Sequence, residues 1–306
     1  MSELLDESQA KVRQRQLRVS DSIAWLKQRT EEVQAQAEKK VASKPAELFL
    51  RGMGDFKRAM PNQIARSSLF APIARGRRQQ FIETLLVTRS DAVISYSGEQ
   101  LDEADADITL QLFFEAKNQP LGLPVTVNRA ALLRALGRQT NVSQYKWLMR
   151  RMKVLTEATL IAEAKRSDGT RKYSVGKTDA FHIVQSFGYD SATKTYNFTL
   201  DPRWAVLFGN DEYALLDWEK RKQIGRGQDM AKSLQLLVAT SSDPIQRYLL
   251  EWLKEKMQYR GRVRDFKKAL ARACRELERL NIIANYKVEL STKGKQQLSL
   301  WMAVSA

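Results

Sequence analysis

Two stretches of this sequence, 122 positions apart, carry the same order of apolar and basic residues. The paired apolar positions, with one lysine, are Leu155 with Leu277, Leu160 with Ile282, Ile161 with Ile283, Ala162 with Ala284, and Lys165 with Lys287. Just before them, basic residues also coincide: Lys146 with Lys268, Arg150 with Arg272, and Lys153 with Arg275. Because a repeated unit builds the same kind of core in each copy, the sequence predicts one folding module that occurs twice.

The elements expected around the first stretch follow a familiar order. Helical spacing predicts three helices, namely 105–117 packed through Ile108, Leu112 and Phe113, 128–137 between the cap Asn128 and the stop Gly137, and 142–157. Four segments rich in strand formers come next, near 159–165, 172–176, 180–187 and 194–200. Helix, turn, helix and then a β-hairpin is typical of a winged helix-turn-helix.

The same order is expected again after Asp201-Pro202. A connecting helix would carry Trp204, Tyr213, Leu216 and Trp218. Three helices should follow over 228–239, 244–257 with Asp243 as cap and Pro244 at its first position, and 262–280. Two strands are then expected at 282–290 and 296–303.

These elements predict an α+β fold of tandem winged helix-turn-helix domains preceded by an N-terminal helical segment. The expected divisions are 1–59, 60–205 and 206–306. The N-terminal segment has only a weak apolar stripe, formed by Ile23, Leu26, Val33, Ala37 and Val41. It is interpreted as a solvated helix or, alternatively, as a helix that binds a partner or a second copy.

Helical geometry, at about 100° per residue, separates a buried face from a basic face on two of these helices. The buried positions expected in 262–280 are Val263, Phe266, Leu270, Ala273 and Leu277, with Cys274 near their edge, and those in 142–157 are Tyr145, Leu148, Met152 and Leu155. The opposite faces are cationic, and Arg279 lies at the end of the second one. The candidate DNA-binding residues on these faces and on the hairpins that follow are Lys146, Arg150, Lys153, Arg166, Arg171, Lys172, Arg264, Lys268, Arg272, Arg275, Lys293 and Lys295.

The overall charge favours this interpretation over an ordinary solvated face. The chain has 51 Lys and Arg against 35 Asp and Glu, a net charge of +16 and a pI near 9.9. Such an excess is typical of proteins that bind polyanions, and phosphate contacts would make binding strongly dependent on salt. Two recognition helices in one chain suit an asymmetric site of about two DNA turns, because each helix reads one major groove.

The segment SDGTRKYSVGKTDAF, residues 167–181, contains the Gly-Lys-Thr that ends a phosphate-binding P-loop. A P-loop needs a glycine five residues before that Gly-Lys pair, but Arg171 stands there. The flanking residues are strand formers, and Asp168-Gly169 is a strong hairpin signal. We therefore expect a basic hairpin that lies along the DNA backbone as a wing, rather than a nucleotide site.

Catalysis and metal binding are poorly supported by the residues present. The chain has one cysteine, Cys274, and one histidine, His182, which excludes a disulfide framework and any site built on paired histidines. The acidic run from Asp102 to Asp107 is interpreted as the capped start of a helix. We expect no enzyme activity and no cofactor.

No apolar run is long enough to span a bilayer. The first residues, MSELLDESQA, lack the basic start and apolar core of a secretory signal. We therefore expect a cytoplasmic protein that does not act at a membrane.

Several short motifs together resemble one family, the TrfA-type replication initiators of broad-host-range plasmids. The motifs are Met60-Pro61-Asn62, Arg66-Ser67, Leu69-Phe70, Tyr96-Ser97-Gly98-Glu99, Gln119-Pro120-Leu121-Gly122, Leu207-Phe208, Trp218-Glu219-Lys220 and Ala273-Cys274-Arg275-Glu276-Leu277. The resemblance implies a bacterial, plasmid-associated protein with two winged-helix domains that bind directly repeated origin sequences, called iterons. It also implies opening of adjacent AT-rich DNA, recruitment of the host helicase and initiator, and a monomer–dimer equilibrium that controls copy number.

Two further interpretations remain open at the level of sequence. Gln297-Leu298-Ser299-Leu300-Trp301 resembles the peptide by which replication proteins grip the sliding clamp, although alternating apolar residues fit a wing strand equally well. A transcriptional repressor with the same tandem reader is the alternative function. A nuclease is disfavoured by the single histidine and by the absence of a convincing acidic cluster.

Overall fold

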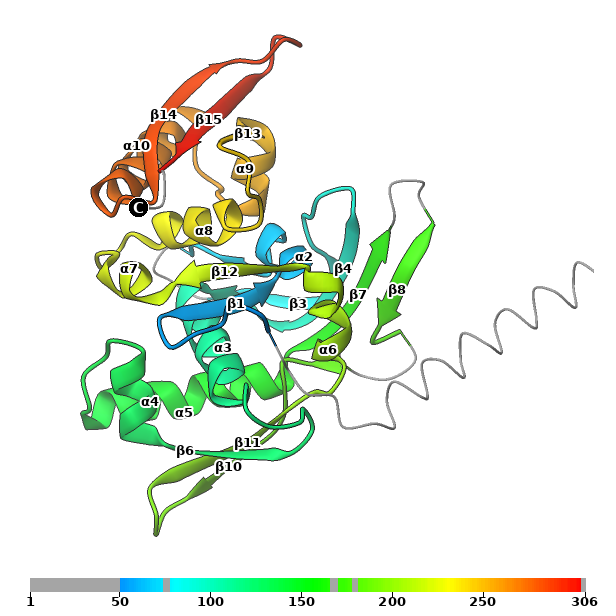
Figure 1. The fold of residues 1–306 in the computed structure, drawn as a ribbon, viewed down its shortest axis with the longest axis vertical. Helices are drawn as coiled ribbons and strands as arrows, with labels where there is room; N and C mark the ends of the chain where they lie inside the picture. Colours follow the sequence, from blue (N-terminus) through cyan, green and yellow to red (C-terminus); the bar gives the residue numbers. More distant parts are fainter. Residues whose placement is uncertain (1–49, 74–77, 166–169, 178–180, 304–306) are drawn as a thin grey trace, which may run out of the picture. The chain divides into compact units, whose positions relative to one another are not determined.

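A helix buried along nearly its whole length, α3 (Glu103–Glu115), lies at the centre of the part of the chain described here (Figure 1). Its first turn is closed by a capping box. Asp102 accepts hydrogen bonds from the backbone of Ala104 and Asp105, and the Asp105 carboxylate accepts one from the Asp102 backbone. Ile108 and Phe113 have no exposed surface, as expected from their spacing. The interpretation of the acidic run as a capped helix start is therefore confirmed.

The computed structural model describes residues 50–73, 78–165, 170–177 and 181–303. The described residues all belong to one compact unit, which spans 46–306. The predicted N-terminal helix, Arg166 and the Asp168-Gly169 turn lie outside the described residues.

Six elements form what we call the first module. They are α3, β6 (Pro124–Asn128), α4 (Arg129–Ala135), α5 (Val142–Glu157), β10 (Val184–Asp190) and β11 (Thr195–Leu200). The three strands are ordered β10-β11-β6, so the strand between the first two helices lies beside the last strand. As predicted, Asn128 caps α4, since its side chain accepts hydrogen bonds from Ala130 and Ala131.

Six later elements, the second module, repeat this arrangement. They are α8 (Asp229–Val238), β13 (Ile245–Leu249), α9 (Leu250–Lys256), α10 (Val263–Arg279), β14 (Ile283–Leu290) and β15 (Gln296–Met302). Their strand order, β13-β15-β14, equals that of the first module written from the other edge, β6-β11-β10, so β13 corresponds to β6, β15 to β11 and β14 to β10. The same order of elements, with the same strand neighbours, therefore occurs in two parts of the described chain.

A second sheet interrupts the first module. It contains β3 (Gln80–Leu85), β4 (Ala92–Glu99), β7 (Thr159–Lys165) and β8 (Arg171–Val175) in that order, with β9 (Phe181–His182) also paired with β7. The sequence alignment of β7 with β14 was thus wrong, because β14 corresponds to β10. Alternating apolar residues fit any half-buried strand, so they could not distinguish the inserted β7 from its later neighbour.

The elements that precede α3 and follow β11 tie the two modules together. Strand β1 (Lys57–Pro61) pairs antiparallel with β12 (Tyr213–Asp217), and β2 (Phe70–Ala71) pairs in parallel with β5 (Leu101–Asp102). The remaining short helices are α2 (Asn62–Arg66), α6 (Trp204–Leu207), the 3₁₀ turn η1 (Gly209–Asp211) and α7 (Trp218–Gln223).

Two predicted helices are wrong. The connecting helix is replaced by α6, β12 and α7, because Ala214 and Leu216 are buried while Tyr213 and Leu215 are only partly so, which is the period of a strand. The helix over 244–257 begins only at Leu250, after β13. In β13 the buried residues are Gln246 and Tyr248, again at alternate positions.

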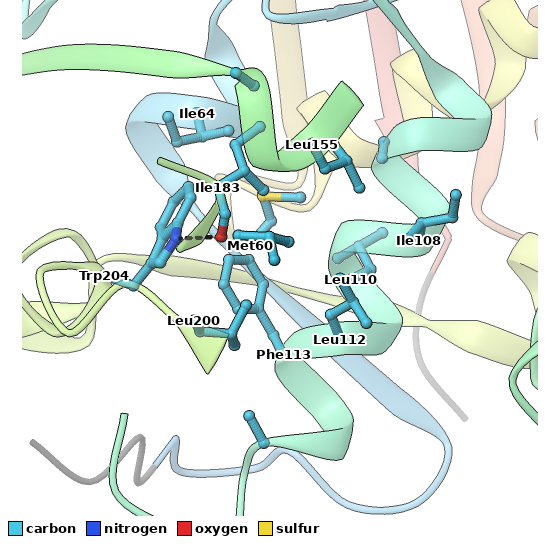
Figure 2. Close-up of a cluster of buried hydrophobic side chains, with 14 of the residues drawn as sticks. Met60, Ile64, Ile108, Leu110, Leu112, Phe113, Leu155, Ile183, Leu200 and Trp204 are labelled. Atoms are coloured by element: carbon cyan, nitrogen blue, oxygen red, sulfur yellow. Dashed lines mark hydrogen bonds between the residues drawn. The ribbon is translucent and has the colours of Figure 1, made fainter. Parts of the chain in front are cut away.

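The core consists of two clusters of apolar side chains. The larger one surrounds Trp204, whose indole N–H donates to the Ile183 carbonyl at 3.1 Å and whose ring lies 4.9 Å from that of Phe113 (Figure 2). The smaller one belongs to the second module and includes Phe266 and Leu277. The domain boundaries expected at 59/60 and 205/206 remain predictions. Strand β1 spans the first boundary, and its pairing with β12 connects residues on both sides of the second.

Candidate nucleic-acid interface

The basic face of α10 is exposed as the sequence predicted. Arg264, Lys268, Arg272 and Arg275 all lie in solvent, while Phe266, Leu270, Ala273 and Leu277 are buried. Val263 departs from the prediction because it stands at the first position of the helix, and half of its surface is exposed. Cys274 is fully buried, and this burial raises the pKa of its thiol to about 12, which suits an apolar filler.

Most of these cations are not neutralised within the protein. Among the described residues, no acid forms an ion pair with Lys268, Arg272 or Arg275, and Arg264 is 3.9 Å from Asp265 with three-quarters of its side chain exposed. Arg279 differs, since it pairs with Glu276 at 2.8 Å and donates to the Gln223 carbonyl at 3.0 Å. The cations available to a ligand therefore lie before the last turn of α10.

The hairpin β14–β15 carries the last two predicted residues at its tip. Lys293 and Lys295 are exposed on either side of Gly294, whose positive φ of 69° closes the turn. The tip projects away from α10 (Figure 1). The second module thus presents cations at two separate places, on its long helix and at the end of its hairpin.

The first module repeats the exposed helix face on α5. Lys146, Arg150 and Lys153 are exposed, and Leu148 and Met152 are buried beneath them. Arg150 keeps 70% of its side chain in solvent and makes one long contact of 3.4 Å with Glu99. The positions that coincide with Lys268, Arg272 and Arg275 in sequence are therefore exposed in both modules.

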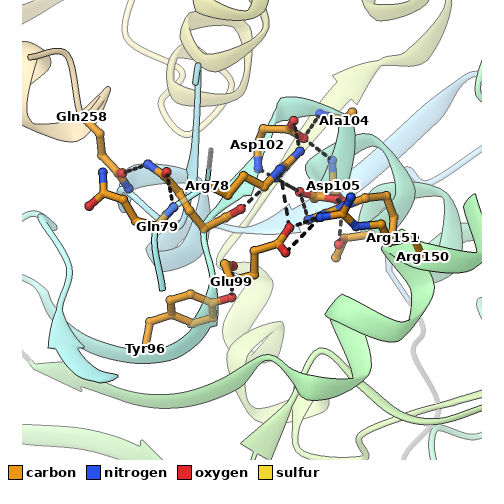
Figure 3. A network of polar contacts seen from close by, with 12 residues as sticks. Arg78, Gln79, Tyr96, Glu99, Asp102, Ala104, Asp105, Arg150, Arg151 and Gln258 are labelled. Carbon is orange, nitrogen blue, oxygen red and sulfur yellow. Dashed lines mark hydrogen bonds and ion pairs between the residues drawn. The ribbon is translucent and has the colours of Figure 1, made fainter. Parts of the chain in front are cut away.

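Sequence reasoning missed the role of the next residue, Arg151. It is buried and forms two hydrogen bonds to Asp105, of 2.6 and 2.8 Å, and one to Glu99 of 2.5 Å (Figure 3). Arg78 adds a bond of 3.0 Å to the same Asp105. Burial alone would raise the pKa of Glu99, but its contacts with Arg151 lower it. This network fixes α5 against the start of α3. In the sequence, the signal for it was the closely spaced acids Asp102 and Asp105, with the arginine pair 150–151 further along the chain.

A polar cleft of 740 Å³ opens beside this network. It is lined by Arg78, Gln79, Gln80, Glu99, Trp147, Arg150 and Arg151. Glu99 contacts all three of these arginines, and Asp102 and Asp105, which do not line the cleft, also pair with Arg78 or Arg151. The acids of the network therefore offset part of the positive charge, while the cleft itself is lined by three arginines and one acid. Within the described residues, no group of three or more His, Cys, Asp or Glu side chains is placed to hold a metal ion.

The hairpin β7–β8 does not accompany α5, which packs on β10 instead. Arg166 lies outside the described residues, and Arg171 is exposed at the start of β8. Lys172 points inward and pairs with Glu212 at 2.5 Å, in a cleft of 500 Å³. Gly176 has a φ of +84°, and the next described element after Lys177 is the strand β9, where a P-loop would continue into a helix.

The clamp-binding interpretation of Gln297–Trp301 does not fit the structure. These residues form the middle strand of their sheet, and Leu298 and Leu300 have no exposed surface. A clamp-binding peptide must offer its apolar side chains to a pocket on the partner. Here both leucines are part of the core of the second module, so this prediction is withdrawn.

The two modules are connected through buried and half-buried side chains. Arg221 of α7 binds Glu103 at 2.9 Å and Asp107 at 2.6 Å, and it also donates to the Lys232 carbonyl of α8. Gln258 donates to the Ser68 carbonyl at 2.7 Å. The exposed basic faces of the modules are therefore held at a fixed separation within one compact unit.

The chain is similar in sequence to a curated replication protein. The chain is 27% identical, over 176 residues, to the plasmid replication initiator protein TrfA of Escherichia coli. The aligned region covers 56% of this chain and 44% of that relative, so less than half of the relative's length is matched.

Two crystal structures of domains 2 and 3 of RctB have similar backbones, with TM-scores of 0.49 and 0.47 and 12% identity. They cover 80% and 79% of this chain, and 99% and 96% of their own.

The family model described as TrfA protein matches residues 18–290, which is most of the chain. The resemblance seen in the short motifs is thereby confirmed. No helix among the described residues is long and apolar enough to cross a membrane. The chain belongs to the TrfA protein family.

Proposed function

We propose that this protein initiates plasmid replication by binding directly repeated origin DNA through two winged-helix modules. The observation that carries this proposal is the exposure of matched cations, Arg150 with Arg272 and Lys153 with Arg275, on one long helix of each module. Membership of the TrfA family supports the initiator role. A small set of exposed cations on a helix is the surface that DNA readers present to phosphates and base edges.

The order of elements in the two modules supports this proposal. Each has three helices and a sheet in which the strand after the first helix lies beside the last strand. We propose α5 and α10 as the recognition helices, because each precedes the final hairpin of its module and carries the exposed cations. We propose that they read major grooves about one turn apart.

Binding of origin DNA is the direct test. The full chain would be titrated against a labelled duplex carrying the repeats of its own origin, and against a scrambled duplex of equal length. With about six to ten phosphate contacts, affinity should fall by roughly 10³–10⁵ between 50 and 200 mM salt. Equal affinity for the two duplexes, or binding that is insensitive to salt, would count against the proposal.

Initiation is a separate claim from binding. We propose that the bound protein opens AT-rich DNA next to the repeats and recruits the host helicase and initiator, with monomers active and dimers inhibitory. A plasmid that carries the origin should replicate only when the intact gene is supplied. Tight origin binding with no plasmid maintenance would favour the alternative, a tandem winged-helix repressor.

A further inference from the structure

In the first module, the charge pattern of the sequence indicates β7–β8 as the hairpin that faces DNA. Comparison of the two modules indicates β10–β11 instead. In the second module, the hairpin that follows the long helix is β14–β15, and its strand β15 lies next to β13. The equivalent hairpin of the first module is β10–β11, with β11 next to β6. The strongly basic β7–β8 belongs to the inserted sheet.

One cation is placed where β10–β11 meets the helices. The guanidinium of Arg129, the first residue of α4, lies 4.1 Å from the ring centre of Tyr145 on α5 and 5.1 Å from that of Tyr189 on β10. Tyr189 in turn packs edge-on against the fully buried Tyr196. Contact with two rings, one of them backed by the core, holds the guanidinium in a fixed place.

The hydrogen-bonding edge of Arg129 remains available. Among the described residues, no acid pairs with it and no acceptor receives a hydrogen bond from its side chain; only its backbone N–H is used, by the Lys194 carbonyl. The contrast is Arg203, which also lies over a ring but is bound by Asp201. An arginine fixed by aromatic rings with free N–H groups suits an anion that accepts two parallel hydrogen bonds.

The surroundings favour a long anionic ligand. Lys146 is the next residue after Tyr145 on α5 and is exposed. Lys194 is exposed at the tip of the hairpin, where a φ of 57° turns the chain. The acid at this tip, Asp190, is occupied by hydrogen bonds from Ala192 and Thr193, both at 2.8 Å. Arg129 and Lys194 thus lie side by side, since the Arg129 backbone N–H donates to the Lys194 carbonyl, and an exposed lysine follows Tyr145 on α5.

We propose that Arg129 and Lys194 bind backbone phosphates of duplex DNA, and that β10–β11, rather than β7–β8, is the DNA-contacting hairpin of the first module. This inference rests on the proposed DNA-binding function. It adds two contact residues that the charge pattern of the sequence did not single out, and it removes Lys172, which is held by Glu212, from the contact surface.

The test compares single charge removals in the full chain. Arg129→Ala should weaken binding of the origin duplex about tenfold and reduce the slope of log K against log salt by about 0.9, the value of one phosphate. The loss should be equal for the scrambled duplex, because a phosphate contact carries no sequence information. Arg129→Lys should keep the slope but bind less tightly, since it keeps the charge and loses the flat stack.

Lys177→Ala is the control from the other hairpin, since Lys177 follows β8, keeps 62% of its side chain exposed and has only a long contact of 4.0 Å with Glu163. It should change neither affinity nor slope. The inference is overturned if Arg129→Ala binds like the wild type, or if Lys177→Ala lowers the slope as much. If Arg129→Ala fails to fold, Lys194→Ala carries the test, and an unchanged slope rejects the inference. Failure of the wild type to bind any duplex would instead reject the proposed function itself.

Discussion

Neighbouring arginines in this protein have opposite roles, and burial decides between them. Arg150 and Arg151 are adjacent on α5, but 70% of the Arg150 side chain is exposed whereas 3% of Arg151 is. The exposed arginine is available to a ligand, and the buried one binds acids of the protein. On α10 the same distinction separates Arg272, which has no acidic partner among the described residues, from Arg279, which pairs with Glu276.

This distinction gives a prediction for DNA affinity. Arg272→Ala should weaken binding of origin DNA by about 1–3 kcal/mol if the side chain reads a base, and should relax sequence preference at one position. Arg279→Ala removes the same charge from the same face of α10. It should have a much smaller effect, because Glu276 already binds the Arg279 guanidinium. Equal losses for both variants, measured by equilibrium titration, would mean that only net charge matters.

At the scale of elements, sequence patterns were most reliable where the helical periodicity continued without interruption over many residues. The predicted helix 142–157 has the observed bounds, and 262–280 differs from α10 by one residue at each end. Short elements were misassigned: Pro244 suggested a helix start, but it precedes the five-residue strand β13. Such segments contain too few residues for their period to be measured, and pairing with distant strands decides their structure.

The candidate site could be predicted only in part for a similar reason. The exposure of the cations on α5 and α10 could be predicted from helical geometry, because a helix that buries one face leaves the opposite face in solvent. Which hairpin accompanies α5 depends on strand pairing across more than 50 residues, from β6 to β11, and that pairing leaves no local signal. Arg129 could not be found for the same reason, since its two tyrosines come from different elements.

The attachment of α5 to α3 should depend strongly on Arg151. Arg151→Met keeps the side-chain volume similar but leaves Asp105, which is fully buried, without its main partner. We expect a loss of about 3–5 kcal/mol in the free energy of unfolding, the usual cost of breaking a buried pair. Arg150→Met, next to it on the same helix, should cost no more than about 1 kcal/mol.

Denaturant titration followed by circular dichroism would measure both losses. Comparable stability of the two variants would show that the network around Asp105 does not hold α5 in place.

At the scale of the whole molecule, the central feature is that two basic helices belong to one compact unit. Trp252 of α9 donates to the Thr88 carbonyl at 3.1 Å, and Arg66 of α2 donates to the Thr240 carbonyl at 2.7 Å. These bonds join the second module to the elements around the inserted sheet. Because the modules cannot separate freely, a duplex that contacts both α5 and α10 must present its grooves at a set spacing.

A high-resolution footprint on origin DNA tests this most directly, using the wild type and two triple variants, Lys146→Ala/Arg150→Ala/Lys153→Ala and Lys268→Ala/Arg272→Ala/Arg275→Ala. We predict two protected patches about 34 Å apart on one face of the duplex, with each triple variant losing a different patch. A single patch in the wild type, or loss of the same patch from both variants, would contradict the claim that the two modules read DNA together.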